Sequence, residues 1–301
     1  MRLWRIIFIS LILSLLAASA CQTGQPQGSV TDDLGRSVAI KNIPRRIISL
    51  SPSNTEIVYA LGLEERLIGV TSYCNYPPSV KSKPVVSEYS VVDVEKIVSL
   101  QPDLILADSI HKATVIPALE RLNIPVLAIN PADLEETFRG IEMIGRVTGK
   151  GQVAEDLVSS LKKRVDSVTG KTAGLTAPER PRTFFLTWHD PLWTAGSGTL
   201  VNDLILLAGG ANIASALDGH RQMELESVVQ SNPQVILVLS SMGEQNTSLE
   251  YIKNEPRFQA TEALKKGRVY PVDADIFGRA TPRSVDGLEE LARLIHPELF
   301  K

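Results

Sequence analysis

The sequence of 301 residues predicts an α/β protein built from two similar lobes, joined by a single long helix and separated by a ligand cleft. Three observations predict this fold class. Short apolar runs alternate with helix-like segments, which is typical of βαβ units and parallel sheets. One helix–Pro–strand pattern occurs twice, and a long amphipathic segment lies between the copies. With 44% hydrophobic residues, the chain is long enough for two such lobes.

The amino terminus has the pattern of an export signal. Arg2 and Arg5 supply positive charge, and residues 6–18 form an apolar run that is too short to span a bilayer as a helix. Residues 18–21, Ala-Ser-Ala-Cys, resemble the cleavage motif of bacterial lipoproteins, in which the cysteine becomes the first mature residue and carries lipid. We therefore expect a lipoprotein signal peptide over residues 1–20 and lipid on Cys21. An ordinary cleaved signal followed by an incidental cysteine is the alternative.

The residues after the signal predict a tether. Residues 21–30 are polar, with Gly, Pro, Ser and Gln and no apolar periodicity, so we expect a flexible link between anchor and domain. Cys74 is the only other cysteine. If Cys21 carries lipid, Cys74 has no partner within the chain and no disulfide supports the fold. The role of Cys74 stays open.

Residues 31–149 predict the first lobe. Apolar runs predict strands at 47–50, 67–70, 104–107 and 126–129, and helices are expected at 53–60, 94–100, 114–122 and 133–147. Ser53 and Glu56 have the spacing of a capping box, in which the glutamate side chain bonds back to the start of the helix. The alternation of strands and helices predicts a largely parallel sheet.

A long helix and a second lobe follow. Residues 152–168 place apolar residues three and four apart, which indicates one helix about 25 Å long. We assign residues 150–170 to this connecting helix and residues 171–301 to the second lobe. Gly and Pro residues predict a loop over 169–181. Strands are then expected at 183–187, 235–239 and 269–272, and helices at 200–208, 226–230 and 285–294.

An internal repeat supports two lobes of the same design. Residues 95–106 (EKIVSLQPDLIL) align without a gap to residues 226–237 (ESVVQSNPQVIL). In each copy a short helix begins with Glu, ends before Pro and leads into an apolar strand. A helix followed by Pro and a strand is also a common local pattern in α/β proteins. The alternative interpretation is therefore that the two segments are similar without being a repeat.

The sequence offers no recognisable catalytic or metal-binding constellation. Its four histidines are scattered, and it contains neither HExxH, nor Gly-x-Ser-x-Gly, nor a phosphate-binding loop. The net charge of −3 gives no basic excess for nucleic acid. We therefore expect no catalytic residue, no metal site, no cofactor, no nucleic-acid partner and no enzymatic role. A cell-surface enzyme or an adhesion module would need a nucleophile, a metal cluster or exposed strand repeats.

Several aromatic residues are expected in loops that follow strand ends. They are Tyr73, Tyr76, Tyr89, Trp188, Trp193 and Phe277. In open α/β sheets the carboxyl ends of the strands border the ligand crevice, so these rings would line a cleft suited to a large ring-bearing ligand. Each tryptophan could instead cover the core of its own lobe.

Four segments resemble the substrate-binding proteins of ABC importers for cobalamin, iron–siderophore complexes and haem. They are residues 48–56 (ISLSPSNTE), 73–78 (YCNYPP), 190–196 (DPLWTAG) and 279–283 (RATPR). Such proteins have two Rossmann-like lobes joined by one long helix, with the ligand between them. The segment at 73–78 is most similar to cobalamin binders. The resemblance therefore implies a corrinoid as the transported ligand, with an iron–siderophore complex or haem as the alternative.

The same resemblance implies roles for individual residues. The implied ligand-binding residues are Tyr73, Tyr89, Trp188, Trp193, His220, Phe277 and Arg279. His220 is also consistent with an ordinary surface loop. Tyr89, His220 and Ile276 stand where a cobalamin binder carries tryptophan, which leaves the identity of the corrinoid open.

The resemblance also implies partners. In the family a glutamate on each lobe docks against arginines of the membrane permease, and Glu95 and Glu226 occupy matching positions of the repeat. A glutamate there also stabilises the start of a helix, and both roles are compatible. We expect a monomer that is secreted across the cytoplasmic membrane, tethered to lipid through Cys21, and faces the periplasm or the cell surface. Its partners would be a permease dimer and the ATPase of an ABC importer.

Overall fold

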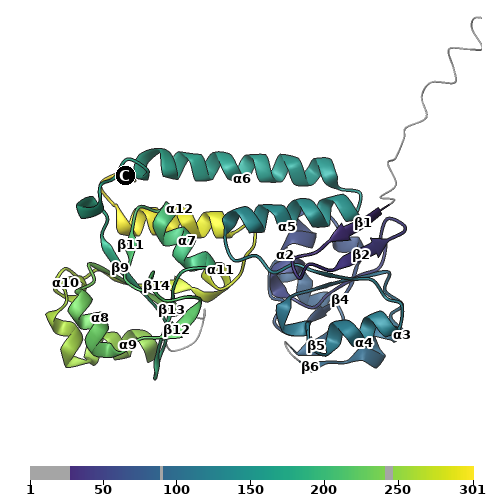
Figure 1. The fold of residues 1–301 in the computed structure, drawn as a ribbon, viewed down its shortest axis with the longest axis horizontal. Coiled ribbons are helices and arrows are strands. Elements are labelled where there is room, and N and C mark those ends of the chain that lie inside the picture. Colours follow the sequence, from purple (N-terminus) through teal and green to yellow (C-terminus); the bar gives the residue numbers. More distant parts are fainter. Residues whose placement is uncertain (1–27, 89–90, 241–246) are drawn as a thin grey trace, which may run out of the picture.

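The computed structural model describes residues 28–88, 91–240 and 247–301. Two α/β lobes lie side by side, and helix α6 (Gly151–Thr172) runs along one edge of both (Figure 1). Helix α5 (Leu134–Val147) packs against α6 in the first lobe, and α12 (Ser284–Ile295) packs against it in the second. The predicted fold class, two α/β lobes connected by one long helix, is confirmed.

The first lobe is built on a six-stranded sheet. Its strand order is β6 (Val91–Val92), β5 (Val85–Glu88), β4 (Leu67–Thr71), β3 (Ile47–Ser49), β7 (Leu104–Ala107) and β8 (Val126–Ala128). All neighbours are parallel except β5 and β6. Every residue of β3, β7 and β8 is buried, as expected for parallel strands covered on both faces. The covering helices are α2 (Pro52–Ala60), α3 (Val94–Ser99), α4 (Val115–Arg121) and α5, and short 3-10 turns lie at η1 (Glu64–Arg66), η2 (Pro78–Ser82) and η3 (Ser109–His111).

A two-stranded hairpin precedes this sheet. Strand β1 (Gly28–Thr31) pairs antiparallel with β2 (Ser37–Ile40). Val38 and Ile40 are buried in the core of the first lobe. The predicted tether over residues 21–30 is therefore wrong at its end, because Gly28–Val30 already belong to a paired strand. The rest of that segment and the predicted signal peptide lie outside the described residues.

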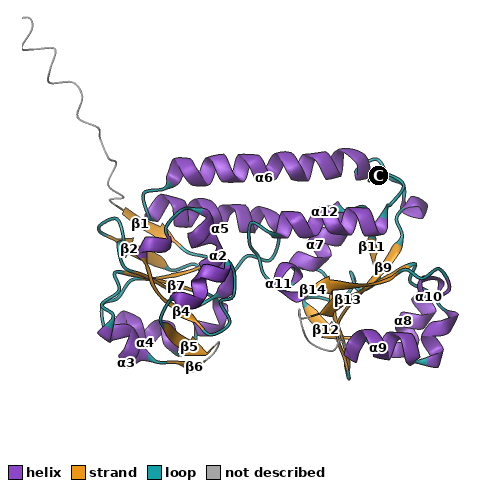
Figure 2. Cartoon of the chain, turned by 180° about the vertical axis from the view of Figure 1, so that it is seen from behind, coloured by secondary structure: helices purple, strands orange, loops and turns teal. Residues whose placement is uncertain are grey.

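The second lobe has a mixed sheet. Its order is β12 (His220–Gln222), β10 (Leu192–Ala195), β9 (Arg182–His189), β13 (Val235–Ser240) and β14 (Val269–Asp273), and β11 (Ala211–Asn212) also pairs with β9. Strands β9, β11, β13 and β14 are parallel, whereas β10 and β12 are antiparallel to their neighbours. Figure 2 shows the helices on either side of this sheet: α7 (Leu200–Leu207), α8 (Leu225–Ser231), α9 (Thr247–Asn254), α10 (Glu262–Lys265), α11 (Ala274–Phe277) and α12. Two 3-10 turns, η4 (Ala177–Glu179) and η5 (Pro256–Ala260), complete the lobe.

The repeat in the sequence corresponds to equivalent elements in the two lobes. Its copies form α3 followed by β7 and α8 followed by β13. Gln101 and Asn232, the residues before the two prolines, both have positive φ angles, 48° and 46°. Since a residue before proline disfavours the right-handed helical region, this left-handed turn ends both helices in the same way.

Two elements are longer than predicted. Helix α6 continues through Thr172, so the expected loop does not begin at residue 169. The hydroxyls of Thr169 and Thr172 donate to carbonyls one turn back, and the helix reaches 22 residues, or about 33 Å. Strand β9 continues through His189 and pairs with β10. Trp188 and Trp193, which were expected in a loop, are therefore cross-strand neighbours in a β-hairpin.

No helix within the described residues is both long and apolar enough to span a bilayer.

Candidate functional site: the interlobe cleft

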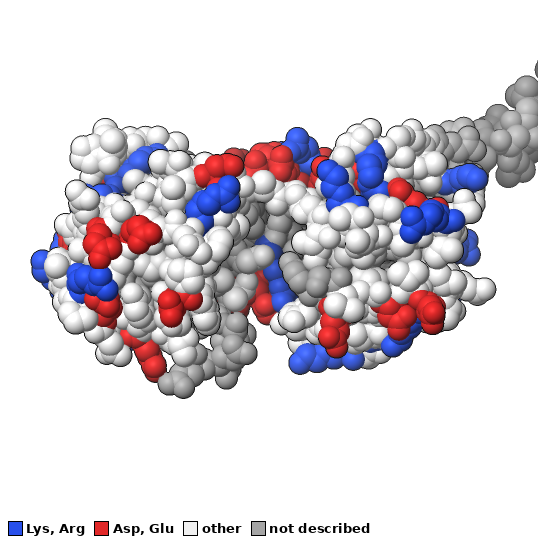
Figure 3. Space-filling model, turned by 60° about the horizontal axis from the view of Figure 1, so that its bottom comes forward, with Lys and Arg blue, Asp and Glu red and all other residues white. Residues whose placement is uncertain are grey.

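Two adjoining cavities lie between the lobes at the carboxyl ends of the first lobe's strands. One, of about 240 Å³, is lined by segments that follow β3, β4, β7 and β8 and by residues 278–280 of the second lobe. The other, of about 350 Å³, is lined by residues 130–132 of the first lobe and by 198–201, 219–220 and 277–278 of the second. Asn130, Pro131 and Gly278 line both cavities, so the two form one cleft. Figure 3 shows this hollow, with charged side chains at its base.

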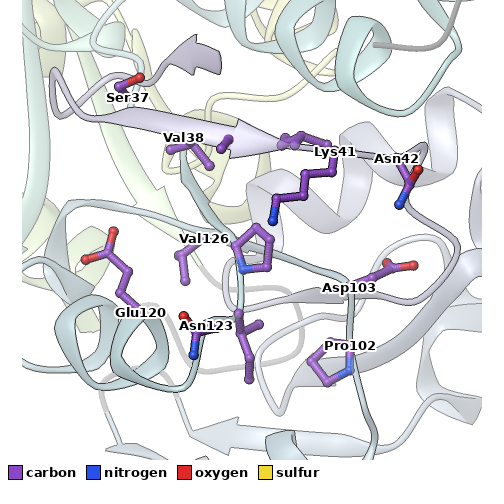
Figure 4. Close-up of a pocket in the computed structure, with 13 residues that line it drawn as sticks. Ser37, Val38, Lys41, Asn42, Pro102, Asp103, Glu120, Asn123 and Val126 are labelled. Atoms are coloured by element: carbon purple, nitrogen blue, oxygen red, sulfur yellow. The ribbon is translucent and has the colours of Figure 1, made fainter. Parts of the chain in front are cut away.

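A larger cavity, of about 560 Å³, lies elsewhere, on the outer side of the first lobe. It is bounded by β2 and by the residues that precede β7 and β8, and is therefore at the amino ends of those strands. Figure 4 shows Lys41, Glu120 and Asn123 around this groove. Glu120 is already paired with Arg36 at 2.6 Å. Because ligand crevices in open α/β sheets form at the carboxyl ends of strands, the interlobe cleft is the better candidate.

A buried ion pair joins the lobes at the base of the cleft. Glu56 of α2 is 3% exposed, and its carboxylate accepts hydrogen bonds from Arg283 at 2.6 Å and 2.7 Å. Helices α2 and α11 lie on the facing sides of the two lobes (Figures 1 and 2). The hydrogen bonds to Glu56 raise the pKa of Arg283 above its ordinary value. The Tyr76 ring stacks on the Arg283 guanidinium, 4.0 Å from ring centroid to Cζ.

Arg279 extends this connection and lines the first cavity. Its Nη2 lies 2.6 Å from an Asp275 carboxylate oxygen, and its Nη1 donates to Asn75 Oδ1 at 2.7 Å. Further contacts join Arg279 to the Tyr73 carbonyl at 3.3 Å and to Glu56 at 3.5 Å. Asn75 in turn donates to Asp275 at 2.6 Å. The guanidinium proposed as a ligand contact is thus engaged by protein oxygens on both sides of the cleft.

The predicted capping box on α2 is wrong. The helix begins at Pro52 with Ser51 at its N-cap, and no side chain caps it. The Glu56 carboxylate is directed to Arg283 and Arg279 of the other lobe instead. A partner more than 200 residues away cannot be inferred from local spacing, and two full charges bind a carboxylate more strongly than one backbone N–H does.

The structure separates the other proposed ligand contacts into two groups. Tyr73, His220 and Phe277, like Arg279, line the two cavities, whereas Trp188 and Trp193 line neither. Tyr73 is 56% exposed, but Phe277 is only 2% exposed and packs on Phe185 with ring centroids 6.3 Å apart. Tyr89 lies outside the described residues.

Trp188 and His220 belong to strands β9 and β12 of the second lobe, and both are exposed. Trp188, 51% exposed, donates from its indole to the Asp190 carbonyl at 2.8 Å, and its ring lies 4.8 Å from that of His189. His220 begins β12, next to the second cavity. Desolvation by the surrounding atoms lowers the pKa of His220 below its ordinary value, which favours the neutral ring.

The two proposed docking glutamates occupy equivalent places in different surroundings. Glu95 and Glu226 lie in the first turns of α3 and α8, and both are exposed. Glu226 pairs with Arg257 at 2.7 Å, and Arg257 is also held by Glu255. Hydrogen bonding to Glu255 raises the pKa of Arg257 above its ordinary value. Within the described residues Glu95 has no such cationic partner.

Cys74 and Cys21 are the remaining candidate reactive groups of the sequence. Cys74 is buried, and its sulfur lies 3.2 Å from the Thr55 hydroxyl and 3.3 Å from that of Thr71. The described part of the chain contains no cluster of three or more His, Cys, Asp or Glu side chains that could hold a metal. Cys21, proposed to carry lipid, is outside the described residues.

The sequence reasoning missed three residues of the cleft base: Glu56, Asp275 and Arg283. Arg279 and Arg283 are four residues apart, and both occur in a segment that carries the family resemblance. Their presence in one short segment would have suggested that two guanidinium groups lie close together in the second lobe. The positions of the two carboxylates could not be inferred, because they depend on the packing of separate lobes.

Comparison with known proteins gives a consistent result. The chain is 34% identical over 278 residues, 91% of this chain and 87% of the relative, to an uncharacterized ABC transporter substrate-binding lipoprotein of Bacillus subtilis (strain 168). It is 28% identical over 250 residues, 82% and 85% of the two chains, to a vitamin B12-binding protein of Yersinia pestis (strain Pestoides F). A solved structure of a possible iron-binding protein from Staphylococcus epidermidis covers 85% of this chain and 100% of its own, with a TM-score of 0.74 and 29% identity. The sequence pattern of the periplasmic binding protein family matches residues 47–276, and the chain belongs to that family.

Proposed function

We propose that the interlobe cleft binds a corrinoid such as cobalamin and that the protein delivers this ligand to the membrane permease of an ABC importer. The chain is a substrate-binding protein of an ABC transporter by family. A relative over most of its length is a vitamin B12-binding protein. The cleft lies between the lobes, where a ligand would contact both at once.

The balance of charge in the cleft carries this proposal. Arg279 is the one lysine or arginine that lines the two described cavities, and it is neutralised by Asp275 and Glu56. Desolvation lowers the pKa of His220, which favours its neutral form. Asp108 is the one carboxylate among the other lining residues, which are otherwise small, apolar or uncharged, and Tyr73 supplies an exposed aromatic ring. Such a cleft suits cyanocobalamin, which carries no net charge, better than a polyanionic chelate.

Iron–siderophore or haem binding is the second candidate. A structural neighbour with 29% identity is described as possibly iron-binding. The Tyr73 ring lines the first cavity, and a phenolate oxygen is a suitable hard ligand for ferric iron. This function would require the anionic groups of the chelate to find cations other than those already paired at the base of the cleft.

We further propose that Glu95 and Glu226 dock against arginines of the permease. Their equivalent places on two lobes suit a partner with twofold symmetry. When Glu226 docks, a permease arginine would replace Arg257 as its partner or share the carboxylate with it. The Arg257–Glu226 ion pair is exposed and contributes little to stability, so its loss would cost little free energy. Attachment through Cys21 would place the cleft outside the cytoplasmic membrane, next to the permease.

A titration distinguishes the candidate ligands. Every described element begins at or after Gly28, so a chain lacking residues 1–21 retains the whole described fold. Tryptophan fluorescence of this chain would be followed on addition of cyanocobalamin, a ferric siderophore and haemin. Saturable quenching by cyanocobalamin alone supports the corrinoid proposal. Binding of the siderophore or haemin without cyanocobalamin would refute it.

A further inference from the structure

Four charged side chains at the base of the cleft form a neutral cluster. Glu56 and Asp275 supply two negative charges, and Arg279 and Arg283 supply two positive charges. Glu56 belongs to the first lobe and the other three belong to the second. The arginine side chains are 14% and 17% exposed, so both lie close to the surface of the cleft without being open to it.

Protein oxygens occupy the hydrogen-bonding edges of the guanidinium groups that an anionic ligand would use. Glu56 binds Arg283 through two nearly parallel hydrogen bonds, which is the arrangement a ligand carboxylate or phosphate would adopt. Asp275 and Asn75 bind the two terminal nitrogens of Arg279. A ligand anion would have to replace a carboxylate that is already in place, and it would gain no charge interaction by doing so.

We infer that Glu56 and Asp275 set the charge selectivity of the cleft by acting as internal counter-anions for Arg279 and Arg283. This inference rests on the proposed function and adds to it a physical reason for a preference against anionic macrocycles. An incoming anion meets one paired arginine, Arg279, with the Glu56–Arg283 pair next to it, and the Asp108 carboxylate, which also lines the first cavity. A ligand without net charge meets no such repulsion.

The inference predicts that removal of either carboxylate charge increases the affinity for an anionic macrocycle. Loss of a purely structural ion pair would not produce such an increase. Removing one carboxylate charge leaves the cluster with a net positive charge beside the cavity. Asp275→Asn changes charge but not shape at a side chain that is 35% exposed, so it disturbs packing little. Glu56→Gln likewise removes one negative charge without a change of shape, at a side chain that is 3% exposed. Asp275→Asn/Arg279→Gln and Glu56→Gln/Arg283→Gln restore neutrality and serve as matched controls.

The probe is coproporphyrin III, a flat macrocycle with four carboxylates and no metal, so tyrosine ligation of iron cannot contribute. Its dissociation constant would be measured by fluorescence for the wild-type chain lacking residues 1–21 and for all four variants, alongside that of cyanocobalamin. One unit of positive charge near the carboxylates should tighten coproporphyrin binding about tenfold in both single variants. The gain should weaken as salt is added and should be absent from both double variants.

Two results would overturn the inference. One is an unchanged coproporphyrin affinity in a folded Asp275→Asn chain. This variant tests the inference even if Glu56→Gln fails to fold. The other is a gain that persists in the charge-balanced double variants. The wild-type titration with cyanocobalamin tests the corrinoid proposal separately, because the comparison among variants does not depend on its outcome.

Discussion

Glu56→Gln should destabilise the protein far more than the loss of an equally well-formed ion pair at the surface. The Glu56 side chain is 3% exposed, and its arginine partner Arg283 is 17% exposed. Removing one member of a buried pair costs about 3–5 kcal/mol. Because glutamine keeps one oxygen as an acceptor and Arg283 retains some contact with water, we expect a loss of about 2–3 kcal/mol.

Glu289→Gln is the matched control. Glu289 also binds an arginine, Arg164, through two hydrogen bonds of 2.8 and 2.9 Å, but the side chains are 29% and 37% exposed. After allowance for screening by solvent, its loss should cost about 0.5–1 kcal/mol. Urea unfolding followed by circular dichroism would compare both variants with the wild type. A cost for Glu56→Gln that is no larger than that for Glu289→Gln would refute the assignment of the buried pair.

Three further predictions concern docking, packing and pH. Charge reversal at both Glu95 and Glu226 should abolish ligand uptake by cells and leave the affinity of the purified protein unchanged; normal uptake would contradict the docking proposal. Phe277→Ala should lower the free energy of unfolding by about 3–5 kcal/mol because the ring is buried against Phe185, and a loss below about 1 kcal/mol would show that it is not a core residue. The lowered pKa of His220 means that the unfolded chain takes up a proton there first as the pH falls, so stability should decrease from about pH 6.5 down to the folded-state pKa. His220→Asn should remove that part of the pH dependence, and a wild-type slope in this variant would assign it to another group.

The fold was predictable because it depends on local patterns repeated along the chain. Fully buried parallel strands such as 104–107 appear as uninterrupted apolar runs, and the helix–Pro–strand repeat identifies equivalent elements in both lobes. Errors arose where a local signal was ambiguous. The Gly and Pro residues of 169–181 suggested a loop that begins at Thr169, but α6 continues through Thr172 and contains Gly170.

The base of the cleft was much less predictable than the fold. Ser53 and Glu56 satisfied a local capping rule, whereas the actual partner of Glu56 comes from the other lobe. Arg279 was identified from the resemblance, but its neutralisation by Asp275 depends on how α11 turns after β14. Residue types therefore indicated which groups are present near the cleft, and only the packing of the lobes showed which charges cancel.

Hydrogen exchange with and without cyanocobalamin tests the central claim most directly. If a corrinoid binds between the lobes, backbone amides in residues 51–53, 130–132, 198–201 and 278–280 should gain protection, because these segments line the cleft from both sides. Residues 37–42, which line the groove on the outer side of the first lobe, should not change. Protection confined to that groove, or protection of the cleft by a ferric siderophore or haemin but not by cyanocobalamin, would contradict the account.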